Sequence, residues 1–223
     1  AGQGAAAPTG AGAQPVLYAQ RLLLKALLRA ISLAANYATT AAGGRMAGME
    51  DGLLARCLGN IFRRQKDFGG GVFSLAATVM ADLIHHDPQC FPQLDAAGLP
   101  QALLDAVTAG VLPSSEAVCS VPNALIALCL NPAGLRKVRE SGALSCFVPM
   151  FTTRAFSRAM QGDTPSVLGA GIDELLRHVP VLRNDGIRTI LRVLMELCRL
   201  GGDEEGAAAA QAKIAAVVVS PLP

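Results

Sequence analysis

Histidine, cysteine and acidic side chains near residue 85 are the first candidates for chemistry in this 223-residue chain. Asp82, His85, His86 and Cys90 lie close together in the sequence, and all four are residue types that bind transition metals. A zinc site needs three or four converging ligands, and this group shows none of the usual ligand spacings. Histidines near the end of a helix are also favoured by the helix dipole alone. We therefore interpret these side chains as structural and predict no metal or other cofactor.

The six cysteines raise the possibility of redox or nucleophilic chemistry. They stand at positions 57, 90, 119, 129, 146 and 198, and no Cys-x-x-Cys pair occurs. Free cysteine packs as a small hydrophobe, and most of the six lie in apolar helical surroundings. We predict that all six are reduced and that the protein is intracellular, in the cytoplasm, the nucleus or both. No Gly-x-Ser-x-Gly motif is present, so the sequence predicts no nucleophilic active site.

A triple glycine and two charge clusters complete the set of candidates. Gly69-Gly70-Gly71 lacks the preceding strand and the Gly-Lys-Ser/Thr ending of a phosphate-binding loop, so we predict a turn between helices. Asp173-Glu174 with Arg177, and Asp203-Glu204-Glu205, are expected to be solvated surfaces, the first with ion pairs along one helix. His178, at a predicted helix end, is interpreted as structural. The sequence therefore predicts no catalytic, cofactor-binding or metal-binding residue.

A repeat marked by glycine organises the chain. Gly52, Gly98, Gly142 and Gly186 lie 46, 44 and 44 residues apart, each shortly after an acidic residue and directly before an apolar one. Glycine permits the left-handed backbone between two helices, and the acidic residue can cap the next helix. The positions five and nine residues beyond each glycine are all apolar: Cys57, Leu103, Phe147, Leu191, Ile61, Val107, Phe151 and Met195.

This period predicts an all-α fold. One helical pair cannot bury its apolar face alone, whereas stacked pairs share a continuous core. A spacing near 44 residues falls in the range of roughly 40–47 that is typical of HEAT and armadillo repeats. Alanine and leucine dominate and β-branched residues are sparse, which also favours helix. We predict an armadillo/HEAT-like α-solenoid of about four stacked helical repeats.

Composition divides the chain into three segments. Residues 1–15 are uncharged and low in complexity, and they are predicted to be disordered. Residues 16–200 form the predicted repeat domain, and residues 201–223 are interpreted as a flexible spacer with a cut end. The helices expected within the domain include 16–39, 50–66, 72–86, 99–109, 143–153, 166–178 and 186–200.

Charge and hydropathy exclude two classes of partner. The chain has 19 basic and 17 acidic residues, for a net charge of +2, which does not indicate nucleic-acid binding. No apolar run reaches the roughly 18 residues of a membrane span, and no secretory signal is present. We expect protein partners, bound through the surface of the solenoid.

Several segments resemble one family in order and over most of the chain, from about Gln20 to Leu200. That family is the very large HECT-type ubiquitin-protein ligases, with the plant and green-algal members most similar and the animal and fungal members more distant. The segments that carry the resemblance are Ile61–Ala76, Asp82–His85, Phe91–Pro92, Ala97–Pro100, Leu112–Ser115, Val121–Leu125, Cys129–Asn131 and Asp173–His178. The resemblance implies part of a long armadillo-like arm, upstream of the catalytic domain, that recruits substrates and packs against neighbouring repeats of the parent chain.

Cys90 is a false candidate for the ubiquitin-accepting cysteine of that family. The HECT cysteine loop reads Thr-Cys-Phe-Asn before a leucine, whereas here Gln89 replaces the threonine and Pro92 replaces the asparagine. The HECT cysteine also lies near the end of its domain, and 133 residues follow Cys90. Two other hypotheses remain open, an armadillo adaptor with no ligase attached and an enzyme with a cofactor between its helices.

Overall fold

The computed structural model describes residues 16–38 and 52–218. Residues 1–15, which the sequence predicts to be disordered, lie outside the described ranges. Every regular element in the described ranges is helical, as predicted, and no strand occurs there. No helix in these ranges is long and apolar enough to cross a lipid bilayer. The α-helices are α1 (Tyr18–Ala38), α2 (Leu53–Arg63), α3 (Gln65–Phe68), α4 (Gly70–His86), α5 (Phe91–Ala96), α6 (Leu99–Ala109), α7 (Ser115–Cys129), α8 (Pro132–Glu140), α9 (Phe147–Thr152), α10 (Thr164–His178), α11 (Arg183–Leu200) and α12 (Glu204–Ala216).

Four short 3₁₀ helices connect or extend these elements. They are η1 (Pro88–Cys90), η2 (Ala143–Cys146), η3 (Arg154–Phe156) and η4 (Pro180–Leu182). η2 runs directly into α9, where the sequence predicted one helix interrupted at Pro149. Proline lacks the N–H that would bond the carbonyl of Ser145, and its ring collides with that carbonyl in an α-helix. The segment before Pro149 therefore winds more tightly.

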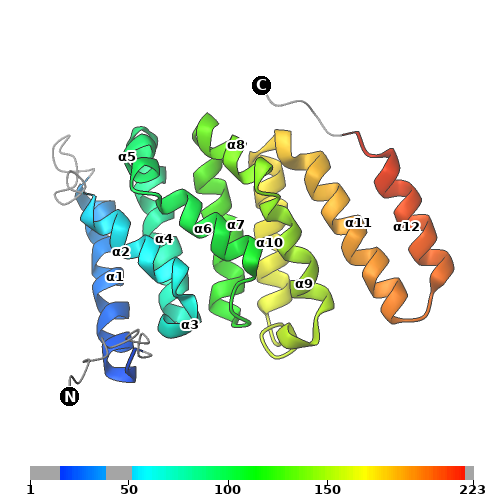
Figure 1. The fold of residues 1–223 in the computed structure, drawn as a ribbon, viewed down its shortest axis with the longest axis horizontal. Helices are drawn as coiled ribbons and strands as arrows, with labels where there is room; N and C mark the ends of the chain where they lie inside the picture. Colours follow the sequence, from blue (N-terminus) through cyan, green and yellow to red (C-terminus); the bar gives the residue numbers. More distant parts are fainter. Residues whose placement is uncertain (1–15, 39–51, 219–223) are drawn as a thin grey trace, which may run out of the picture.

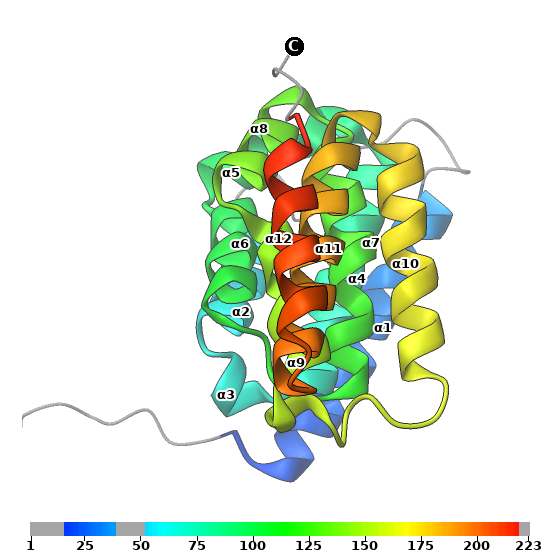
Figure 2. The same ribbon diagram turned by 90° about the vertical axis from the view of Figure 1, so that its right-hand side faces the viewer.

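The long helices form two rows that run side by side along the molecule (Figures 1 and 2). In the first row α1 packs on α4, α4 on α7 and α7 on α10. In the second row α2 packs on α6, α6 on η2, and the η2–α9 segment on α11. The short helices α5 and α8 lie along one edge of the molecule, at the top in Figure 1, and α12 packs on α11 at the C-terminal end of the rows. The predicted α-solenoid is confirmed.

Three of the four marker glycines occupy equivalent places. Gly52, Gly98 and Gly142 have φ of 63°, 73° and 65°, and each directly precedes a second-row helix. Gly186 differs, because η4 leads into α11 at Arg183 and the glycine lies inside that helix. A Cβ at Gly186 would lie 2.3 Å from a methyl carbon of Leu176. Glycine is needed there for the close packing of α10 against α11, not for a turn.

The acidic residues of the repeat do not cap the second-row helices as predicted. No side-chain cap hydrogen bond is present at the start of α2, α6 or η2. The residue in the capping position is the glycine itself, which has no side chain to accept a bond. Asp95 and Asp185 instead pair with basic residues of the neighbouring repeat unit.

One continuous apolar core extends from Leu28 in α1 to Leu182 in η4. Of the predicted apolar positions, five are buried, namely Ile61, Leu103, Val107, Phe147 and Met195. Phe151 and Leu191 are half-buried, and Cys57 is exposed. Cys57 lies on α2, which begins the second row of the described residues and has no earlier helix of that row against it.

The C-terminal segment differs from the predicted flexible spacer. Residues 204–216 form α12, and Asp203 caps it by accepting a 2.8 Å hydrogen bond from the N–H of Gly206. Ala207, Ala210 and Ile214 pack with Met195 of α11 in a small second cluster. The run of alanines supplies high helix propensity, and α11 supplies the apolar face that an isolated helix would lack.

Candidate interaction surface

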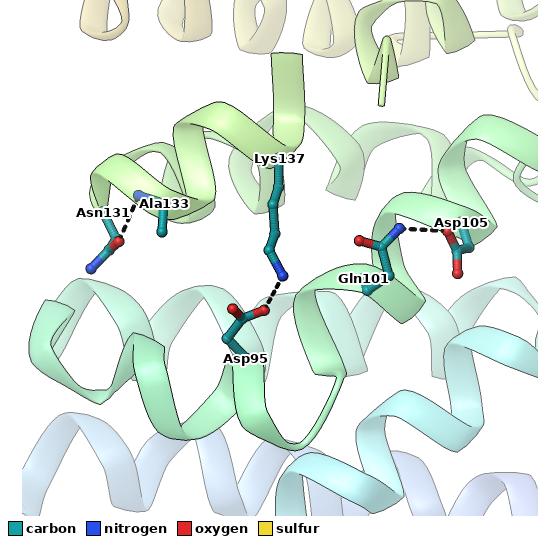
Figure 3. A network of polar contacts seen from close by, with 6 residues as sticks. All are labelled: Asp95, Gln101, Asp105, Asn131, Ala133 and Lys137. Atoms are coloured by element: carbon teal, nitrogen blue, oxygen red, sulfur yellow. Dashed lines mark hydrogen bonds and ion pairs between the residues drawn. The ribbon is translucent and has the colours of Figure 1, made fainter. Parts of the chain in front are cut away.

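Polar contacts between side chains about one repeat apart connect consecutive units. Lys137 of α8 donates to the carboxylate of Asp95 on α5 (Figure 3). Arg139 of α8 lies with its Nε 3.1 Å from a carboxylate oxygen of Asp185 on α11. Half-buried pairs of this kind are directional, so they fix how far each repeat is shifted along its neighbour. A surface that extends over several repeats therefore keeps a defined shape.

Gln65 makes the most extensive of these links. Its side-chain nitrogen donates to the carbonyl of Gly110 at 3.0 Å and to that of Ala106 at 3.5 Å. Its side-chain oxygen accepts a 3.1 Å hydrogen bond from the N–H of Leu112. Gln65 is only 9% exposed, so its side-chain amide is satisfied by these backbone groups rather than by bulk water. Gln65 thus joins α3 to the segment that leaves α6.

The metal-ligand candidates near residue 85 do not converge. His85 and His86 are exposed at the end of α4, while Asp82 accepts a hydrogen bond from Ser32 of α1. Cys90 is buried, with its Sγ 3.7 Å from the carbonyl of Leu83. Across the two described ranges, no three His, Cys, Asp or Glu side chains gather closely enough to hold a metal ion.

The cysteines have free thiols, and burial makes several of them poor nucleophiles. Burial, reinforced by the negative charge of Asp87, raises the pKa of Cys90 to about 11. Burial also raises the pKa of Cys129 and of Cys146 to about 12 each, and it raises the pKa of Cys119. A thiol attacks as its thiolate, which is scarce at neutral pH for such groups. The local structure therefore disfavours Cys90 as a ubiquitin-accepting residue.

The charge clusters lie on helix surfaces, as predicted. Asp173 pairs with Arg177 at 2.8 Å, and Glu174 lies 3.7 Å from a ring nitrogen of His178, all on the exposed side of α10. Of the glycines at 69–71, only Gly69 forms the predicted turn between α3 and α4, with a positive φ of 85°, while Gly70 and Gly71 are the first residues of α4. A Cβ at Gly70 would lie 1.9 Å from the hydroxyl of Ser114, so this glycine permits α7 to approach α4 closely.

The outer side of α4 and α7 in the first row carries polar side chains, some exposed and some half-buried. On α7, Glu116 and Asn123 are exposed and Ser120 is half-buried, while Ser74 and Thr78 lie half-buried on α4. The rest of α7 is almost entirely buried between α4 and α10. Polar side chains therefore follow one face of each of these two neighbouring helices.

A cavity of about 310 Å³ lies between α8, η2 and α11. Three arginines line it, Arg139 from α8 with Arg188 and Arg192 from α11, together with one acidic residue, Asp185. These arginines were not among the candidate residues predicted from the sequence. The spacing of Arg188 and Arg192 does place them on one helix face, but only the packing of the repeats brings Arg139 beside them.

Apolar side chains are exposed on α1, the first described helix, and on α11, against which α12 packs. On α1, Leu22, Leu23 and Leu27 are at least half exposed. On α11 a stripe of partly exposed residues follows the spacing of one helix face, namely Ile187, Ile190, Leu194 and Leu197. Such patches on a helical repeat are typical of surfaces that another helix covers.

Comparison with known proteins gives one family and a consistent set of relatives. The model of the family described as Domain of Unknown Function (DUF913) matches residues 6–220. The E3 ubiquitin-protein ligase UPL1 of Arabidopsis thaliana is 50% identical over 200 residues, which is 89% of this chain and 5% of that protein. The E3 ubiquitin-protein ligase UPL2 of the same plant is 49% identical over 200 residues, with the same two shares. The E3 ubiquitin-protein ligase HUWE1 of Mus musculus is 32% identical over 162 residues, covering 69% of this chain and 4% of that protein.

Proposed function

Because the chain belongs to the family described as Domain of Unknown Function (DUF913), we propose that it is a substrate-recruiting scaffold segment of a HECT-type E3 ubiquitin ligase. It acts in protein ubiquitination and carries no catalytic site of its own. The relatives named above are E3 ubiquitin-protein ligases, which confirms the resemblance found in the sequence. The observation that carries the proposal is that similarity extends over 89% of the chain but only 5% of the plant ligases.

The architecture supports a binding role. Each full unit consists of a short helix, a second-row helix and a first-row helix, as in α5–α6–α7, and we infer that these units are armadillo-like. Solenoids of this kind present extended surfaces on which other proteins bind. We assign substrates or adaptor proteins to the polar outer side of α4 and α7. The exposed apolar residues of α1 and α11 are assigned to neighbouring repeats of the parent protein, acting in the cytoplasm or the nucleus.

The absence of a catalytic role is tested with the chain itself. We expect no reducible ubiquitin adduct after incubation with a charged conjugating enzyme, because the Cys90 thiol is buried and its pKa is raised. An isolated HECT domain serves as the positive control on the same non-reducing gel. A reducible adduct that disappears in Cys90→Ser would contradict the assignment.

The recruiting role is tested in the parent ligase. Deleting residues 16–218 should leave thioester formation at the catalytic domain intact and reduce ubiquitination of the substrates that this segment holds. Loss of the thioester itself would place the segment in catalysis rather than recruitment. If the intact chain is encoded with no catalytic domain, the adaptor hypothesis replaces this proposal.

A further inference from the structure

We propose that the cavity between α8, η2 and α11 binds a phosphoryl group carried by a peptide of a partner protein. This inference rests on the protein-binding role proposed above and specifies one class of partner for it. The cavity lies in the second row, so it is separate from the polar outer side of α4 and α7. Its basic residues come from two consecutive repeat units, so the site forms only when the two units pack in the position seen here.

The guanidinium groups are placed for an anion. Arg188 and Arg192 stand four residues apart on α11, and Arg139 reaches the same cavity from α8. The Nε atom of Arg188 is buried and has no hydrogen-bond partner in the described part of the chain. A buried N–H group of a cation costs free energy until an acceptor reaches it. An anion with several acceptor oxygens relieves that cost.

The charge balance favours a phosphoryl group over a carboxylate. Asp185, already close to Arg139, compensates one of the three positive charges that line the cavity. The remaining charge of about +2 matches a phosphomonoester, which carries about −1.5 to −2 at neutral pH. A glutamate side chain would leave one guanidinium uncompensated. Arginine is also the residue best suited to bidentate contacts with phosphate oxygens.

The dimensions and surroundings favour a peptide as the carrier. A volume of about 310 Å³ is larger than a phosphate ion needs, and it lies at the lower end of ordinary ligand sites of about 300–1,000 Å³. Gly142 forms part of the wall, and a Cβ there would meet nothing within 4 Å. The backbone of a bound peptide therefore has space beside the phosphoryl group. Membrane binding instead requires a broad basic surface, whereas this chain is nearly balanced in charge.

The first test uses inorganic phosphate and does not depend on a known partner. Phosphate should slow the modification of Arg188 and Arg192 by phenylglyoxal, measured by mass spectrometry, more than chloride does at equal ionic strength. Arg183, which is exposed on the same helix and does not line the cavity, is the internal control. Equal rates with phosphate and chloride would overturn the proposal and leave the scaffold role unaffected.

The second test compares fluorescent peptide mixtures that have a central phosphoserine, serine or glutamate between degenerate flanks. Fluorescence polarisation should show tighter binding of the phosphoserine mixture to the 223-residue chain, and Arg188→Gln or Arg192→Gln should weaken it about tenfold each. Arg183→Gln, the matched change of charge, should alter it less than about twofold.

Three results of this second test would overturn the assignment. They are equal binding of the serine or glutamate mixture, equal weakening by Arg183→Gln, and no binding at millimolar peptide. A final comparison uses lipid vesicles that contain a phosphoinositide. Tighter binding to these vesicles than to the phosphopeptide would indicate that the cavity binds a lipid headgroup instead. Circular dichroism verifies that each variant is folded.

Discussion

Replacing Gly134 with alanine should destabilise the solenoid, although the same change stabilises most helix interiors. Gly134 is buried in α8, where a Cβ would lie 2.1 Å from the carbonyl oxygen of Leu128 and 2.8 Å from a ring carbon of Phe91. The carbonyl belongs to the end of α7, and the ring is 1% exposed in the core. Neither group can turn aside as the tip of a long side chain would.

The magnitude follows from two opposing terms. Alanine gains about 1 kcal/mol over glycine through helix propensity. Forcing a methyl group into filled space typically costs about 1–3 kcal/mol, and more where the backbone has to move. Here α7 and α8 must separate by nearly 1 Å before the 2.1 Å contact relaxes even to 3.0 Å. We therefore expect a net loss of about 2 kcal/mol in the free energy of unfolding.

Equilibrium unfolding in urea, followed by far-ultraviolet circular dichroism, measures this loss. Gly169→Ala is the matched control, because Gly169 also lies inside a helix, α10, but a Cβ there would meet nothing within 4 Å. That variant should be more stable than the original chain by about 0.5–1 kcal/mol. The reasoning is refuted if Gly134→Ala unfolds at the same or a higher urea concentration than the original chain.

Three further predictions concern Gln65, the buried thiols, and the exposed apolar residues of α1 and α11. Gln65→Leu should lower the free energy of unfolding by about 1–2 kcal/mol, because the part-buried Gly110 carbonyl and Leu112 N–H lose their partner. Gln101→Leu, which breaks only the exposed hydrogen bond to Asp105 (Figure 3), should change the free energy of unfolding little in the same urea assay. The free energy of unfolding should fall as pH rises above 9, because unfolded thiols then lose protons that Cys129 and Cys146 retain in the folded state up to about pH 12. A variant with Cys129→Ala and Cys146→Ala should show a shallower fall, and an unchanged slope would contradict the argument. Light scattering should show concentration-dependent association of the chain, which Leu23→Glu with Leu194→Glu should abolish; a monomer at all concentrations in the original chain would disprove the role of these exposed apolar residues.

Much of the architecture is predictable from the sequence, because glycine and apolar spacing act locally. The period of Gly52, Gly98 and Gly142 corresponds to three equivalent left-handed turns, and the predicted helix at 99–109 matches α6. α12 was missed although Asp203, followed by two acidic residues and an alanine run, is a helix start. The apolar face of α12 is small, and the reason that this helix is stable is its contact with α11, which the sequence alone does not reveal.

The candidate sites were less predictable, because they depend on pairs of residues in different repeats. The period alone suggests that residues about 44 apart can meet, but it does not specify that Arg139 lies beside Asp185. Asp95 is expected to cap a helix because it stands shortly before α6, but Gly98 occupies the capping position and Asp95 pairs with Lys137 of the neighbouring unit. The burial of Cys90 is likewise set by packing between units rather than by its neighbours in sequence.

Because the apolar core is divided into two clusters, the stability against local unfolding differs along the molecule. The main cluster ends at Leu182, and in the described part of the chain the buried residues of α12 form a separate cluster with Met195 of α11. On heating or under mechanical tension, α12 should therefore detach and unfold first, while the central helices stay folded. Amide hydrogens of α12 would then exchange with solvent well before those of α7, which is buried between two neighbours.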